Sequence, residues 1–323
     1  MRKLLAFLLF CGVAFAQVGL PPAQLVQELR GLNLTQTAQG YSAQGVKFAL
    51  TNRNGALYSV SGSATLNPQG RAGLAKLIGA ATGYGAGLEQ PIADFLKTRA
   101  AELAGQGEVS LNVEEFDLKL SVTGETAPYR AVFALGLAEV EGFPTSTHTL
   151  GPKDAQIVIR EFSDFQCPYC AQYATQVLPE LKKTLLARGN VRFEYHHLPL
   201  TSIHANAQLA AEAAECVTAA NTPAAFWTYH DALFERQKAW EGLGDAAPYF
   251  VRLAKEVGLA NKGVATCLDK GRYTDEIQNA FNAATQQLGV SSTPSVFVGP
   301  YRVPRANDLA SYEKALARLG AFR

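Results

Sequence analysis

The stretch REFSDFQCPYCAQY, residues 160–173, places Cys167 and Cys170 three residues apart, with a proline and a tyrosine between them. It overlaps the apolar run QIVIREF, whose β-branched and aromatic residues predict a strand at residues 156–162. From Cys167 to about Arg188, the apolar spacing predicts a helix. Cys167 therefore lies where a strand gives way to a helix, and Cys170 follows one turn later on the same helix face.

This placement predicts a redox-active dithiol. At a helix start, unpaired backbone N–H groups and the positive end of the helix dipole stabilise a thiolate, which lowers the pKa of Cys167. We therefore expect Cys167 to be the exposed nucleophile. Pro168 suits a first helical turn, where its missing N–H is not needed. Cys170 is within bridging distance of Cys167, and we expect it to be the buried resolving thiol.

Two other uses of the cysteine pair fit the sequence less well. A structural zinc site needs four ligands, and the chain has no second C-x-x-C pair. His196 and His197 would not complete a site, because adjacent residues on a strand point to opposite faces. A purely structural bridge between Cys167 and Cys170 closes a loop too small to constrain the unfolded chain much. The sequence therefore predicts neither a metal site nor a bound cofactor.

Glu161 precedes Cys167 by six residues, on the predicted strand. Its carboxylate has two possible orientations. It can point beneath the helix start and exchange a proton with Cys170, which would make it a third catalytic residue. Alternatively, it is an outward-facing glutamate near the strand end, beside Arg160.

Beyond the helix, the sequence predicts an α/β unit that is interrupted by a helical insertion. The expected elements are a strand at residues 191–200, helices over about residues 203–288, a strand at residues 294–299 and a closing helix at residues 308–319. Cys216 and Cys267 both fall in the insertion. A bridge between them would close a loop whose constraint stabilises the fold by about 4 kcal/mol. We expect this structural disulfide, and the alternative is two free or separately reactive thiols.

Several of these segments resemble a known family. EFSDFQCPYC, the strand before it and SSTPSVFVG near the C-terminus resemble the DsbA-like family of thioredoxin-fold oxidoreductases. The phrases LPLTSIHANAQLAAEAAECV and FWTYHDALFERQ occur in the family's order. The resemblance covers about residues 149–323 and implies a thioredoxin-like α/β domain with a helical insertion at residues 151–323. It also implies a thiol–disulfide oxidoreductase that forms disulfides in exported proteins.

The resemblance assigns residues that bind the substrate. In this fold the proline that faces the dithiol is cis, and the residue before it offers its backbone to an extended peptide, which implies these roles for Pro294 and Thr293. Pro168 and Tyr169 complete the expected substrate-binding set. Strong oxidants of the family have histidine at the position of Tyr169, whereas Pro-Tyr also occurs in the DsbG and glutaredoxin branches. Tyr169 therefore leaves the direction of electron flow open.

The first residues, MRKLLAFLLFCGVAFAQ, have the pattern of an export signal. A short positive region precedes the apolar run Leu4–Phe15, and Ala14-Phe15-Ala16 is a small-x-small cleavage site. We predict a cleaved signal peptide at residues 1–16 and a periplasmic or extracytoplasmic location. An uncleaved anchor is one alternative, although twelve apolar residues are fewer than the roughly 20 that span a bilayer. Lipidation of Cys11 is another, and the bulky Phe10 before it fits that poorly.

Residues 17–140 predict a separate α+β domain without cysteine. A short helix at residues 20–32 comes first, and Asn54-Gly55 marks a hairpin within residues 46–66. The further elements are expected helices at residues 70–81 and 88–104, and a strand pair at residues 108–122 and 129–140. No nucleophile–base pair or metal-ligand spacing is evident, so we expect a docking module or one through which a homodimer forms. Residues 141–150, rich in Pro, Gly, Ser and Thr, are the expected linker.

Composition limits the partners. The chain has 323 residues, is 48% hydrophobic and carries a formal net charge of +1, which predicts a globular protein that does not bind nucleic acid. The expected partners are reduced or misfolded exported proteins and a redox protein that recycles the dithiol. Two rival functions remain: a dimeric disulfide isomerase or reductase of the DsbC and DsbG type, and a peptide-binding chaperone with a regulatory dithiol.

Overall fold

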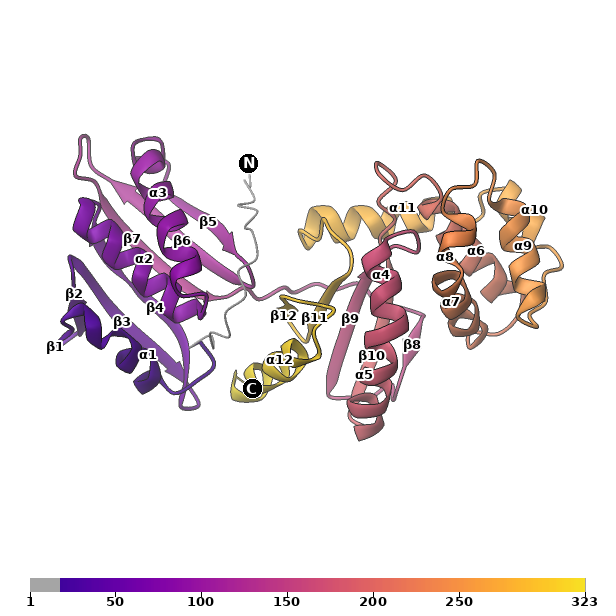
Figure 1. Cartoon of the computed structure of the whole chain (residues 1–323), viewed down its shortest axis with the longest axis horizontal. Coiled ribbons are helices and arrows are strands. Elements are labelled where there is room, and N and C mark those ends of the chain that lie inside the picture. The colour runs from indigo at the N-terminus through magenta and orange to yellow at the C-terminus, as the bar shows by residue number, and fades with distance from the viewer. Residues whose placement is uncertain (1–17, 323) are drawn as a thin grey trace. The chain divides into compact units, whose positions relative to one another are not determined.

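The computed structural model describes residues 18–322, which form two units. The N-terminal unit comprises the chain up to Ala138 together with Leu316–Arg323, and the C-terminal unit is Glu139–Ala315 (Figure 1). The expected signal peptide, residues 1–16, lies outside the described residues. Among the described helices, none combines the length and the apolarity that crossing a bilayer requires.

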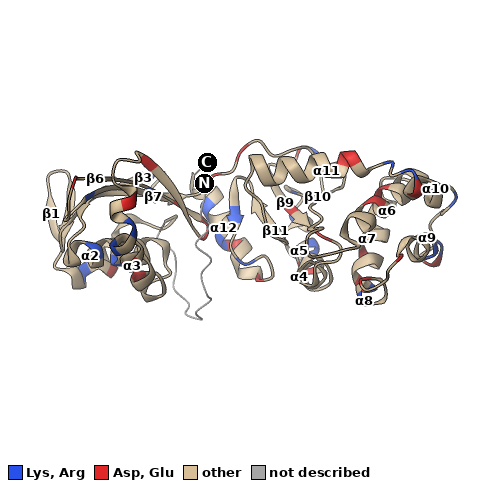
Figure 2. Ribbon diagram, turned by 90° about the horizontal axis from the view of Figure 1, so that it is seen from above, with Lys and Arg blue, Asp and Glu red and all other residues tan. Residues whose placement is uncertain are grey.

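The N-terminal unit is an antiparallel sheet of seven strands in the order β1-β2-β3-β4-β7-β6-β5, with the helices α2 and α3 on one face (Figure 2). Its elements are α1 (Pro22–Glu28), η1 (Leu29–Leu32), β1 (Thr35–Thr37), β2 (Gly40–Ala43), β3 (Val46–Arg53), β4 (Ala56–Thr65), α2 (Pro68–Thr82), α3 (Ala86–Leu103), β5 (Glu108–Val113), β6 (Phe116–Thr123) and β7 (Arg130–Leu137). Along β6, alternate side chains are buried, beginning with Phe116 and Leu118. This period of two gives the sheet one core face.

The turns of this sheet test the predicted hairpins. The Asn54-Gly55 hairpin is confirmed, because β3 pairs with β4 around these residues, whose φ angles are 52° and 83°. The expected second strand pair is wrong in one respect, since residues 108–122 fold back at Glu114 to form both β5 and β6. Glu114 has φ 54°, a conformation that Gly or Asn usually marks. Without such a residue, the alternating pattern conceals the turn.

The C-terminal unit has the predicted thioredoxin-like α/β fold with a helical insertion. Its elements are β8 (Thr149–Leu150), β9 (Ile157–Ser163), α4 (Pro168–Gln172), η2 (Tyr173–Val177), α5 (Leu178–Thr184), η3 (Leu186–Arg188), β10 (Val191–His197), α6 (Ala207–Ala220), α7 (Ala225–Glu235), α8 (Gln237–Trp240), α9 (Ala247–Glu256), α10 (Val264–Asp269), α11 (Thr274–Asn282), η4 (Ala283–Gln287), β11 (Ser295–Val298), β12 (Tyr301–Val303) and α12 (Leu309–Phe322). The strand order is β12-β11-β9-β10-β8, and only β9 and β10 are parallel. Helices α4 and α5 lie on one face of this sheet and α11 on the other (Figure 2).

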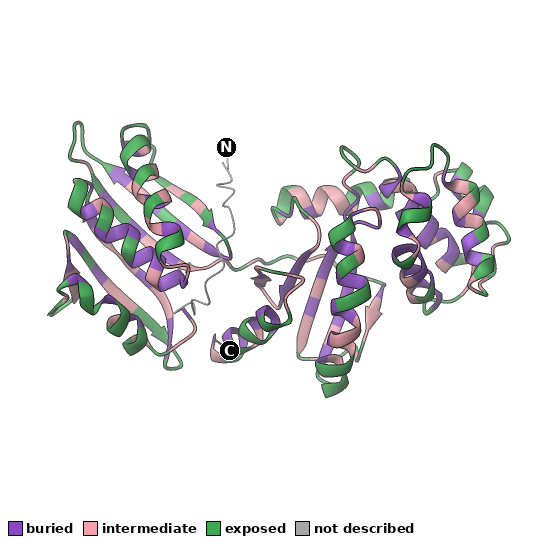
Figure 3. Ribbon diagram, in the orientation of Figure 1, coloured by how far each residue is buried: buried purple, intermediate pink, exposed green. Residues whose placement is uncertain are grey.

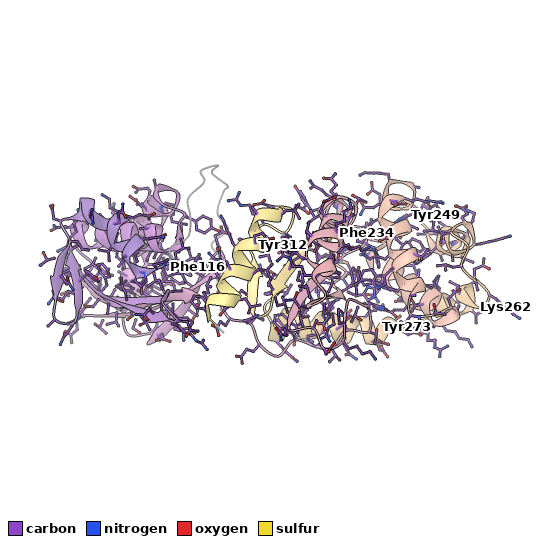
Figure 4. All side chains as sticks on the ribbon, turned by 90° about the horizontal axis from the view of Figure 1, so that it is seen from below. Phe116, Phe234, Tyr249, Lys262, Tyr273 and Tyr312 are labelled. Atoms are coloured by element: carbon purple, nitrogen blue, oxygen red, sulfur yellow. A yellow bond between two sulfur atoms is a disulfide. The ribbon has the colours of Figure 1, made fainter. Side chains whose placement is uncertain are left out.

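Aromatic rings join the insertion to the sheet. The ring of Phe165, just after β9, lies 4.9 Å from that of Phe234 on α7, and the ring of Tyr195 on β10 lies 5.2 Å from that of Phe226. Figure 4 labels Phe234 at this junction. Figure 3 shows the buried faces of α6 and α7 in purple, turned toward the rest of the unit. Burial of these rings contributes to the attachment of the insertion to the sheet.

The predicted linker, residues 141–150, is wrong, because this segment is part of the C-terminal unit. The ring of Phe143 packs edge-on against Phe297 at 5.1 Å and under the guanidinium of Arg160 at 4.6 Å. His148 is buried, and β8 pairs with β10 at the edge of the sheet. The Pro, Gly, Ser and Thr content therefore marks an irregular path across the unit instead of a free connection.

The predicted end of the second domain also needs correction, because Leu316–Arg323 groups with the N-terminal unit. Within that unit, Arg318 Nη1 lies 3.0 Å from Glu115 Oε1, and both side chains are buried. The ring of Phe322 packs edge-on against Tyr58 at 5.2 Å. A buried ion pair and an aromatic contact between distant residues leave no periodic signal in the sequence.

Candidate redox-active site

The two cysteines of C-P-Y-C lie at the junction of β9 and α4. Cys167 is the N-cap residue of α4, with extended φ −72° and ψ 123°, and its N–H donates to the carbonyl of Asp164 at 3.0 Å. Cys170 lies one turn further and is fully buried, whereas Pro168 and Tyr169 are exposed. Both cysteines are free thiols in this structure. The expected exposure of Cys167 is wrong, because this residue is also buried, with 5% of its surface exposed, where the Thr293 carbonyl lies against its sulfur.

The two thiols have opposite electrostatic environments. Hydrogen bonding from the Cys170 thiol, helped by Thr293 and by the backbone N–H groups of Tyr169 and Cys170, lowers the pKa of Cys167 to about 6 against the opposing effect of burial. Burial, reinforced by the neighbouring Cys167, raises the pKa of Cys170 well above its ordinary value. These shifts favour a thiolate at Cys167 and a thiol at Cys170 at neutral pH, with the Cys170 S–H donating a hydrogen bond to the Cys167 sulfur.

Thr293 and Pro294 lie beside the dithiol, 126 residues away from it in sequence. The peptide bond between them is cis, and the Cys167 thiol is 3.5 Å from the Thr293 carbonyl oxygen. β11 begins at the next residue and pairs antiparallel with β9, with Ser295 opposite Phe162. This pairing returns the Thr293-Pro294 turn to the end of β9, where Cys167 follows. Of the four residues expected to bind the substrate, Thr293 thus contacts the Cys167 sulfur, and Pro168 and Tyr169 follow Cys167 directly in the first turn of α4.

Glu161 points into the interior, so the outward-facing alternative is wrong. Its side chain is fully buried between Tyr195 on β10 and Val296 on β11, its partners in the sheet register. Neither of its carboxyl oxygens has a hydrogen-bond partner within residues 18–322. Burial, opposed by the nearby Ser163 hydroxyl, raises the pKa of Glu161 to about 8. Its charge in turn raises the pKa of Cys170, so the carboxyl lies within electrostatic reach of the buried thiol.

Two buried polar side chains that the sequence did not reveal hold the loop before Cys167. Asp164 accepts hydrogen bonds from the N–H groups of Gln166 and Leu200, at 2.7 and 2.9 Å, and contacts His204 Nδ1 at 2.7 Å. No spacing rule predicts that Asp164 binds both the loop before Cys167 and the loop around Leu200. The only available signal in the sequence was its position three residues before Cys167. The loop is therefore fixed by contacts that form only in the folded unit.

Gln237, at the start of α8, is the second such residue. Its Nε2 donates to the carbonyl oxygens of Phe165 and Cys167, at 2.7 and 3.0 Å. Gln237 is buried and comes from the insertion, 70 residues after Cys167. The helical insertion therefore contacts the backbone of the reactive cysteine directly, and nothing in the local sequence of Gln237 indicates it.

The second cysteine pair lies in the insertion. Cys216 on α6 and Cys267 on α10 form a disulfide with a Cα–Cα distance of 5.9 Å across 51 residues of sequence. Both lie away from the dithiol in sequence and on different helices, so this bond links two elements of the insertion. This disulfide and the Cys167–Cys170 pair together include all four cysteines that follow residue 16.

The side chains that could together bind a metal ion lie elsewhere in the C-terminal unit. His196 and His197 diverge as expected: His196 faces Glu194, with Nε2 3.7 Å from a carboxylate oxygen, and His197 faces Glu215. His148, His197 and Glu215 place one donor atom each within 4.8 Å of one another, a cluster that the sequence analysis did not anticipate. His148 lay in the predicted linker, and only the folded sheet brings it to the other two.

With the fold and dithiol geometry established, comparison with known proteins identifies the class. The thioredoxin family model matches residues 144–318, more than half of the chain. The chain belongs to this family. The matched region includes both cysteines of C-P-Y-C and the Thr293-Pro294 turn.

Individual relatives are of two kinds. The Na(+)/H(+) antiporter NhaA 3 of Salinispora tropica is 31% identical over 269 residues, which cover 76% of this chain and 39% of the antiporter. Disulfide bond formation protein D of Bacillus subtilis is 27% identical over 170 residues, or 50% of this chain and 70% of that protein. The crystal structure of oxidised BdbD from Bacillus subtilis aligns with a TM-score of 0.50 and 25% identity, covering 56% of this chain and 98% of BdbD. This chain thus spans about two fifths of the antiporter.

Proposed function

We propose that the protein is an extracytoplasmic thiol–disulfide oxidoreductase that forms disulfides in exported proteins through Cys167 and Cys170. The observation that carries this proposal is the geometry of the two thiols: Cys167 is the N-cap residue of α4 with its sulfur 3.5 Å from the Thr293 carbonyl oxygen, and Cys170 is fully buried one turn later. Hydrogen bonding lowers the pKa of Cys167 from the ordinary 9.0 to about 6, which at pH 7 stabilises the reduced pair about tenfold relative to an unperturbed dithiol. This shift makes the disulfide more oxidising by about 30 mV and so favours the transfer of electrons from substrate thiols to the pair.

The oxidised enzyme begins the reaction. A substrate thiolate attacks Cys167 Sγ, which breaks the Cys167–Cys170 bond and forms a mixed disulfide between substrate and Cys167. The sulfur of Cys170 leaves with the electron pair and takes a proton from protonated Glu161, a buried carboxyl within electrostatic reach of this thiol. Thr293 offers its backbone beside Cys167, where an extended peptide can align with the strand edge.

A second substrate thiolate completes the transfer. It attacks the substrate sulfur of the mixed disulfide, so that a substrate disulfide forms and Cys167 leaves as the stabilised thiolate. The substrate has then lost two electrons and two protons, and the dithiol has gained two electrons. An oxidising partner must regenerate the Cys167–Cys170 disulfide before the next cycle.

Four further observations support the location and the substrates. The Cys216–Cys267 disulfide suits an oxidising compartment, where such bonds persist, and residues 1–16 have the pattern of an export signal. The Bacillus subtilis relative is named for disulfide bond formation. Tyr169 and Ile203 are 64% and 71% exposed, and an unfolded chain presents apolar side chains that would pack against such residues.

The decisive measurement is the reduction potential of the Cys167–Cys170 pair, from equilibrium with glutathione. A value near about −120 mV supports a disulfide-forming enzyme, whereas a value near about −270 mV would make the protein a reductant. The Cys167→Ala variant should lose all oxidation of a reduced test protein. Undiminished turnover by this variant would overturn the proposal.

The separate N-terminal sheet supports a second candidate, a dimeric disulfide isomerase in which this unit forms the dimer. That candidate predicts a dimer in solution and reactivation of a scrambled test protein. A monomer without reshuffling activity excludes it. A chaperone with a regulatory dithiol predicts instead that a variant with serine at both Cys167 and Cys170 suppresses aggregation as well as the native chain does.

A further inference from the structure

Three side chains from separate segments of the C-terminal unit converge on one point. His148 immediately precedes β8, His197 ends β10, and Glu215 lies on α6. The Nε2 atoms of His148 and His197 lie 2.5 and 2.8 Å from the same oxygen of Glu215, Oε1. The three side chains are 7%, 8% and 13% exposed, so the cluster is nearly enclosed yet remains open to solvent at Glu215.

Packing holds the two imidazole rings in place. The ring of His148 stacks on Phe226 with centroids 3.6 Å apart and an interplanar angle of 10°. The ring of His197 meets Tyr195 at 5.2 Å and His148 at 5.9 Å, both edge-on. The main chain adds to this, since the Tyr195 N–H donates to the His148 carbonyl at 3.0 Å. Rings held in this way present their nitrogens in a fixed direction, which is what a metal site requires.

The donor set is one that binds transition metals. Two histidine nitrogens and one glutamate oxygen hold zinc in proteins, with bonds of about 2.0–2.2 Å and a fourth position for water. The two Nε2 atoms contact the same oxygen of the Glu215 carboxylate. A cation between these three atoms would bind all of them.

We propose that His148, His197 and Glu215 bind one zinc ion, at a site separate from the dithiol and independent of the proposed redox function. The ion takes the Nε2 lone pair of each histidine and one oxygen of the Glu215 carboxylate. A proton that either Nε2 atom carries in the ion-free protein moves to Nδ1 or is released to solvent when the ion binds. The two N–O separations of 2.5 and 2.8 Å must open to about 3.4 Å for tetrahedral bonds, which is a small side-chain movement.

The surroundings of the site predict a moderate affinity. Metal-binding histidines usually donate their second N–H to a fixed acceptor, and loss of that acceptor weakens binding about 10- to 100-fold. His197 Nδ1 is buried without a hydrogen-bond partner in the described part of the chain. The ion would therefore be exchangeable, and it would hold together the segment before β8, the central sheet and α6. Glu215 is adjacent to Cys216, so the ion and the disulfide would fix the same helix.

The test uses the whole chain after residue 16, without a purification tag, in the oxidised form. Oxidation of Cys167 and Cys170 removes the two thiols that would otherwise bind zinc. After chelator treatment, zinc chloride alone is titrated by calorimetry, and the thermal unfolding midpoint is followed in parallel. We expect one zinc per chain and a midpoint that rises with zinc concentration, because the ion binds only the folded state.

Variants locate the site. Glu215→Gln keeps the shape of the side chain but removes the charge, and His148→Gln removes a nitrogen ligand, so each should weaken zinc binding at least about tenfold. His196→Gln is the matched control, because it removes the adjacent histidine of the same strand, which faces Glu194 instead. Circular dichroism of the oxidised chain, and alkylation of Cys167 in a separately reduced sample, check that each variant is folded. A variant that fails this check is replaced by His197→Gln.

Three results would overturn the proposal. The first is the absence of saturable zinc binding to the oxidised chain. The second is binding that Glu215→Gln leaves unchanged. The third is an equal loss in His196→Gln, which would place the ion elsewhere.

Discussion

The two cysteine pairs of this chain show how local position decides thiol chemistry. Cys167 and Cys170 lie within one helical turn, where hydrogen bonds hold one thiol ionised and burial keeps the other protonated. Cys216 and Cys267 lie on two helices, 51 residues apart, and are bonded. A bond across a long loop constrains the unfolded chain, whereas a bond across two residues hardly does. One pair is therefore suited to exchange and the other to stability.

The largest effect is expected from substitutions that remove a cysteine of the first pair. Cys167→Ser should abolish oxidation of a reduced test protein, because serine cannot form the mixed disulfide. Cys170→Ser should also stop turnover, but its Cys167 thiolate should attack added oxidised glutathione, release one glutathione thiol and keep the other as a mixed disulfide that is visible by mass spectrometry. Equal trapping by both variants would contradict the assignment of Cys167 as the nucleophile.

Breaking the second pair should affect stability and not chemistry. Replacing Cys216 and Cys267 by alanine together should lower the free energy of unfolding by about 4 kcal/mol, or roughly a thousandfold in the equilibrium. Urea denaturation measures the loss. Single-turnover oxidation by the folded fraction should stay at the native rate, and a slower rate would mean that the two pairs are coupled.

Glu161→Gln should affect one thiol of the first pair, because Glu161 is expected to give its proton to Cys170 and not to Cys167. Without an acidic proton beneath Cys170, departure of this thiol should slow by about a hundredfold, the usual scale of general-acid catalysis. The pH–rate profile should also lose the limb near pH 8 that Glu161 gives the native enzyme. Glu194→Gln is the matched control, since that buried carboxylate is paired with Arg160 and Arg192. A limb near pH 8 that persists in Glu161→Gln would assign it to another group.

The pH dependence of Cys167 tests the thiolate itself. Alkylation of the reduced chain should have its midpoint at about pH 6, and at pH 7 Cys167 should react roughly ninetyfold more readily than a thiol with the ordinary pKa of 9.0 if both thiolates are equally reactive. Because the folded pKa is depressed, the thiolate stabilises the reduced fold fully above pH 9. This contribution is lost as the pH falls through about 6. A midpoint near pH 9 would contradict both expectations.

The smallest expected effect concerns the insertion. Gln237→Leu keeps the bulk but removes both hydrogen bonds to the loop of Cys167, and should lower the free energy of unfolding by about 1–2 kcal/mol. Alkylation of Cys167 should change by only a few-fold. Gln278→Leu, on the exposed side of α11, is the control and should change neither quantity.

Sequence reasoning recovered features whose signals are local. The strand-to-helix junction at Cys167, the Asn54-Gly55 turn and the extent of the insertion follow from periodicity and turn chemistry within short windows. The family resemblance supplied Thr293 and Pro294, which no local pattern connects to the cysteines. The turn at Glu114 was not predicted, because glutamate rarely adopts the positive φ that this turn requires. Sequence patterns therefore miss turns that lack a Gly or Asn.

The sequence by itself determined that this chain has a dithiol at a helix start, within an α/β unit that carries a helical insertion. These features depend on neighbours within a few residues. Only the tertiary structure decided that Glu161 is buried and without a hydrogen-bond partner among the described side chains, and that His148 joins His197 and Glu215. A buried environment is created by side chains from strands and helices far apart in sequence. The burial and charge that set a pKa or form a ligand cluster therefore appear only when the sheet is assembled.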